Sequence, residues 1–385
     1  MKLNMICEEA IEPRCSHFKI CGGCRFQHVS YDLQLAQKRE FIQACFGQNV
    51  EKVLPCDPPW RYRNKMEFSF SQARSGEKFL GLMKSRGRVE NLTECHLTHP
   101  WFTEALCTVR EWWQDSPLNA YYPPSNQGLL RTLTLREGTH TGEKMAVLTV
   151  SEEPIEEQYL VDFADTLPHI DALILRKQII QKKTPTRFEE HVLRGKAHIH
   201  ELLHDEIGRS YRFRIKAASF FQPNTLQAEV IYNQAIAMAE LTSQDEVLDL
   251  YCGTGSLGIF AAAHVSRVLG IEIVPEAVED AHVNMKLNEV SNMQVLAGDV
   301  GLSLEKIAFQ PSTVIVDPPR VGLGSTAIRH LLRLNPEKIV YVSCNPVSQA
   351  ADCASLLGYE VVCLQPVDQF PHTPHVENIA LLRRI

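Results

Sequence analysis

The chain has 385 residues, of which 44% are hydrophobic and 22% charged, an ordinary globular composition with room for two or three domains. The formal net charge is −7, yet the first 100 residues carry 15 basic and 11 acidic side chains, a local balance of 15 − 11 = +4. These numbers exclude a uniformly basic protein that coats nucleic acid, but they permit a local basic surface that binds a polyanion.

Signals for export or membrane insertion are missing from the sequence. No apolar run approaches the roughly 18–20 residues that span a bilayer. The stretch Met1–Glu12 contains three glutamates where a signal peptide would be apolar. We therefore expect a cytoplasmic protein without a membrane anchor. Its twelve cysteines should be mostly reduced, which favours metal binding, a nucleophile or core packing over disulfides.

The amino-terminal segment, residues 1–56, contains a compact cysteine group. Cys15, Cys21 and Cys24 have the spacing C-x(5)-C-x(2)-C, and a fourth cysteine, Cys95, follows at a distance. Three close thiols and a distant fourth suit tetrahedral sulfur coordination, which fits either zinc or a [4Fe–4S] cluster. Four other cysteines lack such partners, and we expect them to be structural: Cys7, Cys45, Cys56 and Cys107.

The residues that follow predict first a helix and then a mixed domain. Helical spacing of apolar residues predicts a helix over Tyr31–Phe46. A proline-rich stretch at Pro55–Pro59 indicates a boundary, and we expect residues 57–209 to form a central α+β domain. Its clearest predicted strands are Leu129–Leu135, Met145–Val150 and Ala172–Leu175.

Residues 61–88 combine basic side chains with aromatic ones in and beside the stretch. Eight basic residues stand against two acidic ones. The basic residues are Arg61, Arg63, Lys65, Arg74, Lys78, Lys84, Arg86 and Arg88. The aromatic residues are Trp60, Tyr62, Phe68, Phe70 and Phe79. Basic groups neutralise phosphates and aromatic rings stack unpaired bases, so the stretch favours an RNA-binding surface. A β-hairpin with a solvated charged face and an apolar core face is the other interpretation, and both can hold.

From about residue 210 onward, short apolar runs alternate with helical patterns. This alternation predicts a doubly wound α/β domain with a mostly parallel sheet over residues 210–385. The predicted strands are Glu246–Tyr251, Val268–Ile273, Gln294–Ala297, Thr313–Val316, Ile339–Val342, Tyr359–Leu364 and Ile379–Leu382. The predicted helices include Pro275–Asn288 and Thr326–Leu334.

The most informative residues follow the ends of these runs, where ligands bind in such folds. A glycine-rich turn, Asp249–Gly258, comes first, and Glu272 ends the second run at a position that suits the hydroxyls of a ribose. Asp299 and the segment Asp317-Pro318-Pro319-Arg320 follow the next two runs. The turn Gly253–Gly258 has the G-x-G-x-x-G spacing that dinucleotide sites share, but the acidic residues around it and after the next runs fit S-adenosylmethionine, which has no pyrophosphate, better than a dinucleotide.

Two further residues indicate covalent chemistry in the same cleft. Cys344 follows the fifth run and precedes a helix, where the pKa of a thiol can be lowered. Glu377 enters the last run after a loop rich in proline and histidine. The alternatives are a buried core thiol and a solvated carboxylate. Three other cysteines fit the core interpretation: Cys252, Cys353 and Cys363.

Five segments together resemble the S-adenosylmethionine-dependent RNA uracil-5-methyltransferases. They are Ser219–Asn224, Asp249–Gly253, Asp317–Arg320, Ser343–Pro346 and His375–Glu377. They occur in the family's order and spacing, and with Cys21-Gly22-Gly23-Cys24 the resemblance covers nearly the whole chain. It implies a Rossmann-like class I methyltransferase domain at the carboxyl terminus. It also implies a [4Fe–4S] cluster, rather than zinc, on four cysteines: Cys15, Cys21, Cys24 and Cys95.

The resemblance implies a role for each site residue. The Cys344 thiolate would add to carbon 6 of uracil, so that carbon 5 gains enolate character and attacks the sulfonium methyl group. Glu377 would then remove the proton left on carbon 5. Gln222 and Asp317 would also reach the uracil edge. The residues implied to line the cofactor site are Gln222, Tyr251, Gly253, Glu272, Asp299 and Asp317.

The expected substrate is a uridine of 23S ribosomal RNA, with the T loop of transfer RNA as the alternative, bound by a monomer. The target base must leave its stack to reach Cys344, so a loop or a remodelled single strand is expected. Only 14 residues precede Cys15. We therefore expect the chain to lack the small β-barrel RNA-binding domain that many family members carry there. Its absence argues against one of the two 23S ribosomal RNA uridines that enzymes of this family methylate.

Other protein classes fit less well. Cytosine-5 methylation also uses a cysteine, but its usual Thr-Cys or Pro-Cys-Ser context is missing. Amine-methylating enzymes carry an aromatic residue where Arg320 stands. A radical S-adenosylmethionine enzyme would need three residues in the first cysteine gap. A non-catalytic RNA-binding or RNA-folding factor would be expected to lose Cys344 or Glu377, and both are present.

Overall fold

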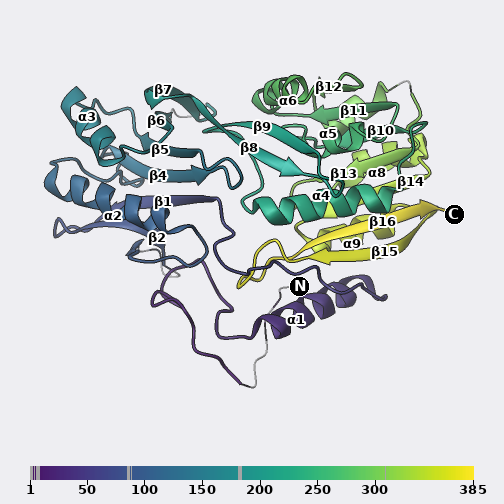
Figure 1. Ribbon diagram of the computed structural model, residues 1–385, viewed down its shortest axis with the longest axis horizontal. Helices are drawn as coiled ribbons and strands as arrows, with labels where there is room; N and C mark the ends of the chain where they lie inside the picture. The colour runs from purple at the N-terminus through teal and green to yellow at the C-terminus, as the bar shows by residue number, and fades with distance from the viewer. Residues whose placement is uncertain are drawn as a thin grey trace.

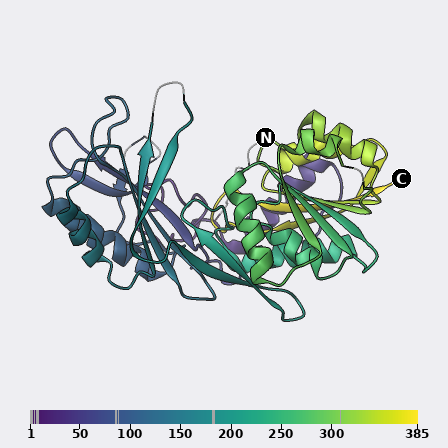
Figure 2. The ribbon, with the colours of Figure 1, turned by 90° about the horizontal axis from the view of Figure 1, so that it is seen from above.

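The computed structural model describes residues 3, 5, 9–84, 87, 89–180, 184–307 and 309–385. Three residues singled out in the sequence, Cys7, Arg86 and Arg88, lie outside these ranges. Figure 1 shows the chain running from a purple amino-terminal segment through a central lobe to a green and yellow carboxyl-terminal lobe. Figure 2 shows the two lobes side by side. Across the described ranges, no helix is long and apolar enough to cross a membrane.

The carboxyl-terminal lobe is a mostly parallel sheet flanked by helices. Its strands are β10 (Glu246–Leu250), β11 (Arg267–Glu272), β12 (Met293–Ala297), β13 (Thr313–Val316), β14 (Lys338–Ser343), β15 (Tyr359–Val367) and β16 (Glu377–Arg384). Its helices are α4 (Thr225–Ala239), α5 (Ser256–Ala262), α6 (Pro275–Leu287), α7 (Val300–Glu305), α8 (Gly324–Leu334) and α9 (Pro346–Ser355). The strand order is β12-β11-β10-β13-β14-β16-β15, and β16 is antiparallel to both neighbours. This arrangement confirms the predicted α/β fold class.

Buried apolar residues explain why these segments form strands. β13 is buried along its whole length, and β10 and β14 are buried after their first residue. Because helices cover both faces of a parallel sheet, such strands are continuous apolar runs. The strands and helices predicted for this lobe are confirmed to within a few residues at each end.

The central lobe is a second, mostly antiparallel sheet. Its strands are β1 (Lys65–Gln72), β2 (Lys78–Met83), β3 (Val89–Asn91), β4 (Leu130–Glu137), β5 (Lys144–Val150), β6 (Ala172–Ile179) and β7 (Arg187–Gly195), in the order β3-β2-β1-β4-β5-β6-β7. Helices α2 (Pro100–Asp115) and α3 (Glu157–Thr166) share one apolar core with this sheet, in which Trp113 and Phe163 are fully buried. Along β1, Phe68 and Phe70 are buried, whereas Glu67 and Ser69, which alternate with them, line a cleft.

A hairpin connects the two lobes. Strands β8 (His198–His204) and β9 (Ser210–Lys216) pair with each other, so the boundary expected between residues 209 and 210 lies within one hairpin. Leu203 and Phe213 of the hairpin belong to the same apolar core as Val147 of β5 and Val247 of β10. The hydrophobic core is therefore continuous from one lobe to the other.

The amino-terminal segment packs beneath the carboxyl-terminal lobe. Its helix α1 (Tyr31–Phe46) has the bounds that the sequence predicted and ends at Gly47, whose φ of 68° is left-handed. Ile42 and Val50 share a core with residues of β14 and β16. Figure 1 shows α1 below α9 and β15. The start of the chain therefore contributes to the lobe formed by its end.

Candidate active site

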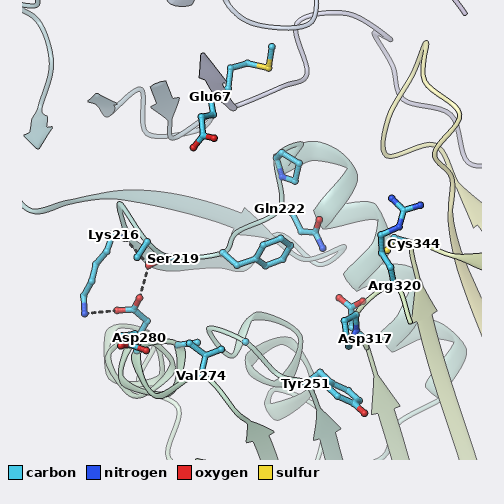
Figure 3. A pocket seen from close by; sticks show the side chains of 18 of the residues that line it. Glu67, Lys216, Ser219, Gln222, Tyr251, Val274, Asp280, Asp317, Arg320 and Cys344 are labelled. Carbon is cyan, nitrogen blue, oxygen red and sulfur yellow. Dashed lines mark hydrogen bonds and ion pairs between the residues drawn. The ribbon is translucent and has the colours of Figure 1, made fainter. Parts of the chain in front are cut away.

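A large cleft between the lobes contains the predicted site residues. Its volume is about 2120 Å³. The central lobe contributes Glu67, Arg176 and Phe188, and the carboxyl-terminal lobe contributes the ends of its strands. All of the predicted catalytic and cofactor-binding residues line it: Cys344, Glu377, Gln222, Tyr251, Gly253, Glu272, Asp299 and Asp317. Figure 3 shows residues from several elements converging on the cleft, with Glu67 on the opposite wall.

The glycine turn after β10 lies where the strand order reverses, which is the usual ligand position in such folds. Tyr251 and Gly253 have positive φ angles of 62° and 54°. A Cβ built on Gly253 would meet no atom within 4 Å, so a ligand can approach the backbone there. Glu272 accepts hydrogen bonds from the backbone N–H groups of Gly253 (3.0 Å) and Val274 (2.8 Å). Its carboxylate therefore fixes both turns that border this end of the cleft.

Two acidic side chains lie near the turn: Asp249 is buried, and Asp317 is half-buried and lines the cleft. Asp249 is 1% exposed, and its Oδ2 has no hydrogen-bond partner among the described residues. Burial, followed by the charge of Asp317, raises the pKa of Asp249 to about 8. Burial also raises the pKa of Asp317 to about 7. Carboxyl groups perturbed in this way, next to a cleft, are typical of functional sites.

The other predicted cofactor residues are each anchored by their own contacts. The side chain of Asp299 caps α7 by accepting a backbone hydrogen bond of 3.1 Å from its first turn. Tyr251 donates its hydroxyl to the carbonyl oxygen of Leu323 (3.3 Å). Gln222 Oε1 accepts a hydrogen bond from Gln369 Nε2 (3.1 Å). These contacts hold the three side chains in defined orientations on the cleft wall.

Cys344 and Glu377 come from neighbouring strands. β14 ends at Ser343 and β16 begins at Glu377, and Ser343 is the register partner of Asn378. The thiol and the carboxyl group therefore meet at the same edge of the sheet. The buried amide of Gln349, on α9, donates to carbonyl oxygens of β14 (2.7 Å) and β16 (3.1 Å). Sheet pairing and this amide together fix the relative position of Cys344 and Glu377.

The pKa of Cys344 is raised, so the lowering expected from its place before a helix is wrong. Burial, followed by Glu377 and Asp317, raises the pKa of Cys344 to about 11, although Arg320 acts in the opposite direction. Burial and Asp317 also raise the pKa of Glu377 to about 8. Desolvation of the thiol therefore outweighs the dipole of α9. A neighbouring base must accept the proton when the thiolate forms.

Arg320 lies beside Cys344 at the edge of the cleft (Figure 3). Its carbonyl oxygen accepts hydrogen bonds from Asn345 Nδ2 (2.8 Å) and Ser348 Oγ (3.1 Å). The segment after β13 is thereby tied to the start of α9. The positive charge held there favours the thiolate of Cys344 and the carboxylate of Glu377.

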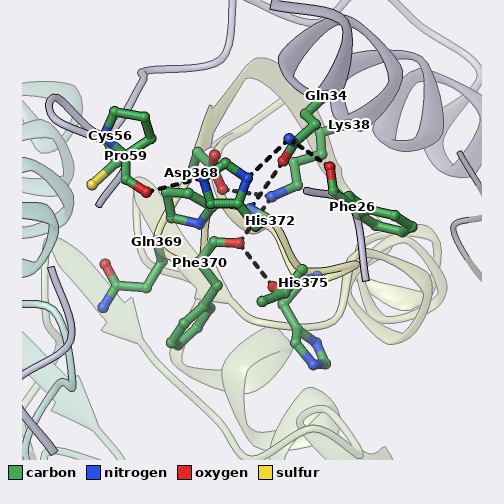
Figure 4. A network of polar contacts seen from close by, with 12 residues as sticks. Phe26, Gln34, Lys38, Cys56, Pro59, Asp368, Gln369, Phe370, His372 and His375 are labelled. Carbon is green, nitrogen blue, oxygen red and sulfur yellow. Dashed lines mark hydrogen bonds and ion pairs between the residues drawn. The ribbon is translucent and has the colours of Figure 1, made fainter. Parts of the chain in front are cut away.

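A buried polar network joins the amino-terminal segment to the loop that precedes β16. The carbonyl oxygen of His372 accepts hydrogen bonds from the backbone N–H groups of Arg25 (2.9 Å) and Phe26 (3.0 Å). Gln34 contacts both the backbone and the ring of His372, and Trp60 stacks on that ring with centroids 3.8 Å apart. Burial lowers the pKa of His372 to about 4. His372, at the centre of Figure 4, is therefore a neutral structural residue.

The four cysteines of the predicted metal site lie close together although one is distant in sequence. Burial, with the neighbouring thiols among the further causes, raises the pKa of Cys15 to about 11 and that of Cys24 to about 12. Cys21 and Cys95 are the other members of this group. The four sulfur atoms do not all lie within 4.8 Å of one another. A tetrahedral zinc site would place them about 3.8 Å apart, because Zn–S bonds are about 2.3 Å long.

The basic stretch forms the expected hairpin, but three of its five aromatic residues are buried in the core. β1 and β2 pair antiparallel, and Tyr62, Phe68 and Phe70 are buried. Trp60 is occupied by its contact with His372. These four rings are therefore not available to stack on bases, and the prediction is wrong for them, whereas Phe79 is only half-buried.

The cleft offers two other aromatic residues, whose exposure the sequence did not indicate. Phe220 is 72% exposed and Phe188 is 43% exposed, and both line the cleft. The guanidinium of Arg176 lies 4.0 Å from the ring centre of Phe188. Phe220 belongs to the segment Ser219–Asn224, so this sequence motif could have identified it as a site residue. Phe188 and Arg176 become neighbours only through the pairing of β7 with β6.

Comparisons with known proteins agree with this geometry. The family profile described as tRNA (Uracil-5-)-methyltransferase matches residues 137–385. An uncharacterised RNA methyltransferase of Protochlamydia amoebophila is 43% identical over 99% of this chain and 93% of its own. Another, from Halalkalibacterium halodurans, is 34% identical over 99% of this chain and 85% of its own. The crystal structure of Pyrococcus abyssi tRNA (uracil-54, C5)-methyltransferase in complex with S-adenosyl-L-homocysteine matches with a TM-score of 0.77 and 29% identity, over 94% of this chain and 86% of that one.

Proposed function

Since this chain belongs to the tRNA (uracil-5-)-methyltransferase family and is an S-adenosylmethionine-dependent RNA methyltransferase, we propose that it methylates carbon 5 of a uridine in 23S ribosomal RNA through a covalent adduct on Cys344. The observation that carries this proposal is the meeting of Cys344 and Glu377 at the ends of neighbouring strands, on one cleft. A uridine in the T loop of transfer RNA is the second candidate substrate, favoured by the substrate named for the Pyrococcus abyssi relative.

The residues around the glycine turn fit the cofactor. When bound, S-adenosylmethionine supplies an electrophilic methyl group on a positively charged sulfur. The open backbone at Gly253 admits a ligand, and the carboxylate of Glu272 can accept hydrogen bonds from ribose hydroxyls. Asp249, with an unpartnered buried oxygen, lies behind this part of the cleft, and Asp317 lines it. A cationic ligand would favour their ionised forms.

Cys344 acts as the nucleophile in this proposal. Its thiol loses a proton to the neighbouring carboxylate of Asp317, which leaves Glu377 free to act as a base later, and the thiolate forms a bond to carbon 6 of the uracil ring. The π electrons of the carbon 5–carbon 6 bond move toward the carbonyl oxygen at carbon 4, which makes carbon 5 nucleophilic. The cation of Arg320 favours the thiolate, because it lowers the pKa of Cys344 against the effect of burial.

Glu377 acts as the general base in the second half of the proposed reaction, after methyl transfer. After methylation, carbon 5 carries both the new methyl group and its original hydrogen. Glu377 removes that hydrogen as a proton, the carbon 5–carbon 6 double bond re-forms, and the sulfur of Cys344 leaves as a thiolate. A pKa of about 8 suits a group that accepts and releases a proton near neutral pH.

Exposed aromatic and basic residues of the cleft would hold the RNA. Phe220 is 72% exposed, so unpaired bases can stack on its ring, whereas Phe188 is already covered on one side by the guanidinium of Arg176. Arg63 and Arg176 line the same cleft and can neutralise phosphates. This arrangement suits a loop or a remodelled single strand, from which the target uracil can turn toward Cys344.

The proposal is tested with labelled S-adenosylmethionine and two RNAs, unmodified 23S ribosomal RNA and transfer RNA. The wild-type chain should form 5-methyluridine in one of them, and Cys344→Ala should form none. Glu377→Gln should accumulate a covalent protein–RNA complex that survives denaturing electrophoresis. Cys363→Ala, whose thiol lies outside the cleft, serves as the control and should retain activity. A Cys344→Ala chain that still forms 5-methyluridine would exclude the covalent mechanism.

We propose further that Cys15, Cys21, Cys24 and Cys95 hold a [4Fe–4S] cluster. The donor set consists of four neighbouring thiols, which is the ligand set of such a cluster. Gly22 allows the loop to pack against β2, since a Cβ there would lie 2.9 Å from the carbonyl oxygen of Met83. The cluster would fix the segment that contacts His372, rather than take part in methyl transfer.

Metal analysis of anaerobically purified protein tests the cluster. Wild-type protein should contain iron and acid-labile sulfide in equal amounts and absorb visible light. Cys24→Ser should lose the iron, whereas Cys45→Ser, a half-buried thiol of α1, should retain it. Stoichiometric zinc without iron would contradict the proposal.

A further inference from the structure

A second group of metal-ligand side chains lies outside the active-site cleft and the cysteine group. The ligand atoms of His140, His204 and Glu229 all lie within 4.8 Å of one another. His140 is in the turn between β4 and β5, His204 ends β8, and Glu229 is on α4. Figure 1 shows β8 alongside α4, between the two lobes. The three residues therefore come from the central lobe, the connecting hairpin and the carboxyl-terminal lobe.

The contacts within this group are crowded around one oxygen atom. Glu229 Oε1 lies 3.0 Å from His140 Nε2 and 2.9 Å from His204 Nδ1, and it also accepts the backbone N–H of His204 at 2.8 Å. A carboxylate oxygen has two lone pairs, so three donors exceed its capacity. If each imidazole is neutral and presents a lone pair instead of a proton, the same atoms become two nitrogen ligands and one oxygen ligand.

The separations of these atoms approach those of a tetrahedral site. Metal–ligand distances of about 2.0–2.1 Å for zinc place neighbouring ligand atoms about 3.3 Å apart. The two observed nitrogen–oxygen separations, 2.9 and 3.0 Å, require an outward movement of only a few tenths of an ångström, and the two imidazole nitrogens lie within 4.8 Å of each other. All three side chains are partly exposed, so an ion can reach them and water can occupy the fourth position.

The surrounding structure holds two of the ligands in place. Buried Glu201 of β8 accepts hydrogen bonds from the backbone N–H groups of Thr139 (2.6 Å) and His140 (3.0 Å), which fixes the turn that carries His140. Asn233 of α4 donates to the carbonyl oxygen of His204 (3.1 Å). Such outer contacts are what orient the ligands of protein metal sites.

We propose that His140, His204 and Glu229 bind a divalent transition-metal ion of the zinc class, which joins the two lobes through the hairpin between them. Two imidazole nitrogens and one carboxylate oxygen form a donor set that suits zinc, cobalt or nickel better than magnesium or calcium. The ion would restrain the relative position of the two walls of the cleft. This proposal is independent of the reaction proposed above.

Titration of the full-length protein, purified with its cysteine site loaded, tests this site with Co²⁺ as the probe. The wild-type chain should bind one Co²⁺ and show visible d–d bands without a thiolate charge-transfer band, because no cysteine takes part. His140→Ala and Glu229→Gln should lose these bands. His198→Ala, a histidine on the same strand outside the group, should keep them. Circular dichroism of each variant distinguishes loss of the site from loss of the fold.

Thermal unfolding with Zn²⁺ provides the second measurement. Zn²⁺ should raise the unfolding temperature of the wild-type chain and of His198→Ala, and it should leave that of His140→Ala unchanged. His140 lies in a surface turn, so its replacement is not expected to prevent folding. Equal shifts for wild type and His140→Ala, or Co²⁺ spectra dominated by thiolate bands, would overturn the proposal.

Discussion

Lys38 Nζ lies 2.6 Å from Asp368 Oδ1 in an ion pair whose two side chains are fully buried. Lys38 is on α1, near the start of the chain, and Asp368 follows β15 in the loop that leads to Glu377. Lys38 also donates to the carbonyl oxygen of Phe370 (3.2 Å). The ion pair is therefore a direct connection between the amino-terminal segment and the loop that carries the proposed base.

Replacing Lys38 should destabilise the protein strongly. In Lys38→Met the carboxylate of Asp368 stays buried without its partner, so we expect the free energy of unfolding to fall by about 3–5 kcal/mol. Lys52→Met, at an exposed lysine nearby, should change it by less than about 0.5 kcal/mol. Chemical denaturation of the three proteins measures the difference. Similar losses in both variants would mean that the pair does not stabilise the fold.

The rate of methyl transfer should rise with pH. Glu377 has a pKa of about 8, so at neutral pH most of it carries a proton and cannot act as a base. Below this pKa, the ionised fraction increases about tenfold per pH unit. Ionisation of Cys344, whose pKa is about 11, changes the rate in the same direction. Single-turnover rates between pH 6 and about 9 should therefore climb, and a rate that falls across this range would contradict the assignment of Glu377.

Glu272 should determine how tightly the cofactor binds. Its carboxylate holds the backbone of Gly253 and Val274 and faces the cleft. Glu272→Gln removes the charge and one acceptor, which should weaken binding of S-adenosylmethionine by about 10–100-fold, since hydrogen bonds to charged groups contribute about 1.5–3 kcal/mol. Isothermal titration calorimetry measures this change. Glu289→Gln, at an exposed position beyond α6, is the control, and equal affinities for the two variants would rule out the assigned role.

Arg320 should affect formation of the adduct more than binding of the RNA. Its charge opposes the effect of burial on the pKa of Cys344. Because the thiolate fraction falls about tenfold for each unit by which a thiol pKa rises, Arg320→Gln should slow adduct formation about tenfold or more at neutral pH. Arg320→Lys keeps the charge and should recover much of the rate. A lysine variant as slow as the glutamine variant would show that charge is not the reason.

The carboxyl-terminal lobe was the most predictable part of the molecule. Its strands are buried on both faces, so each is visible as an apolar run, and ligands bind where such strands end. Asp317 and Cys344 were identified in this way, and both lie on the cleft. Helix α1 was likewise predicted with its observed bounds, although its packing against α9 was not.

Features that depend on contacts between distant segments could not be predicted. Tyr62 lies between two arginines and Phe70 within the same basic stretch, and only the fold reveals that both are buried. The raised pKa of Cys344 follows from burial in the assembled cleft, whereas the sequence showed only the helix after it. His140 and Glu229 are 89 residues apart and meet through the packing of the connecting hairpin on α4.

The insertion of β16 between β14 and β15 also constrains how the protein can be made. The sheet of the carboxyl-terminal lobe lacks an interior strand until residues 377–384 have been synthesised, although its other strands precede them. We therefore expect nascent chains that stop before β16 to remain sensitive to proteolysis, and protease digestion of stalled translation products tests this. Glu377 is the first residue of β16. The proposed base is therefore synthesised together with the strand that completes the sheet. Premature termination would thus release unfolded chains rather than a weakened enzyme.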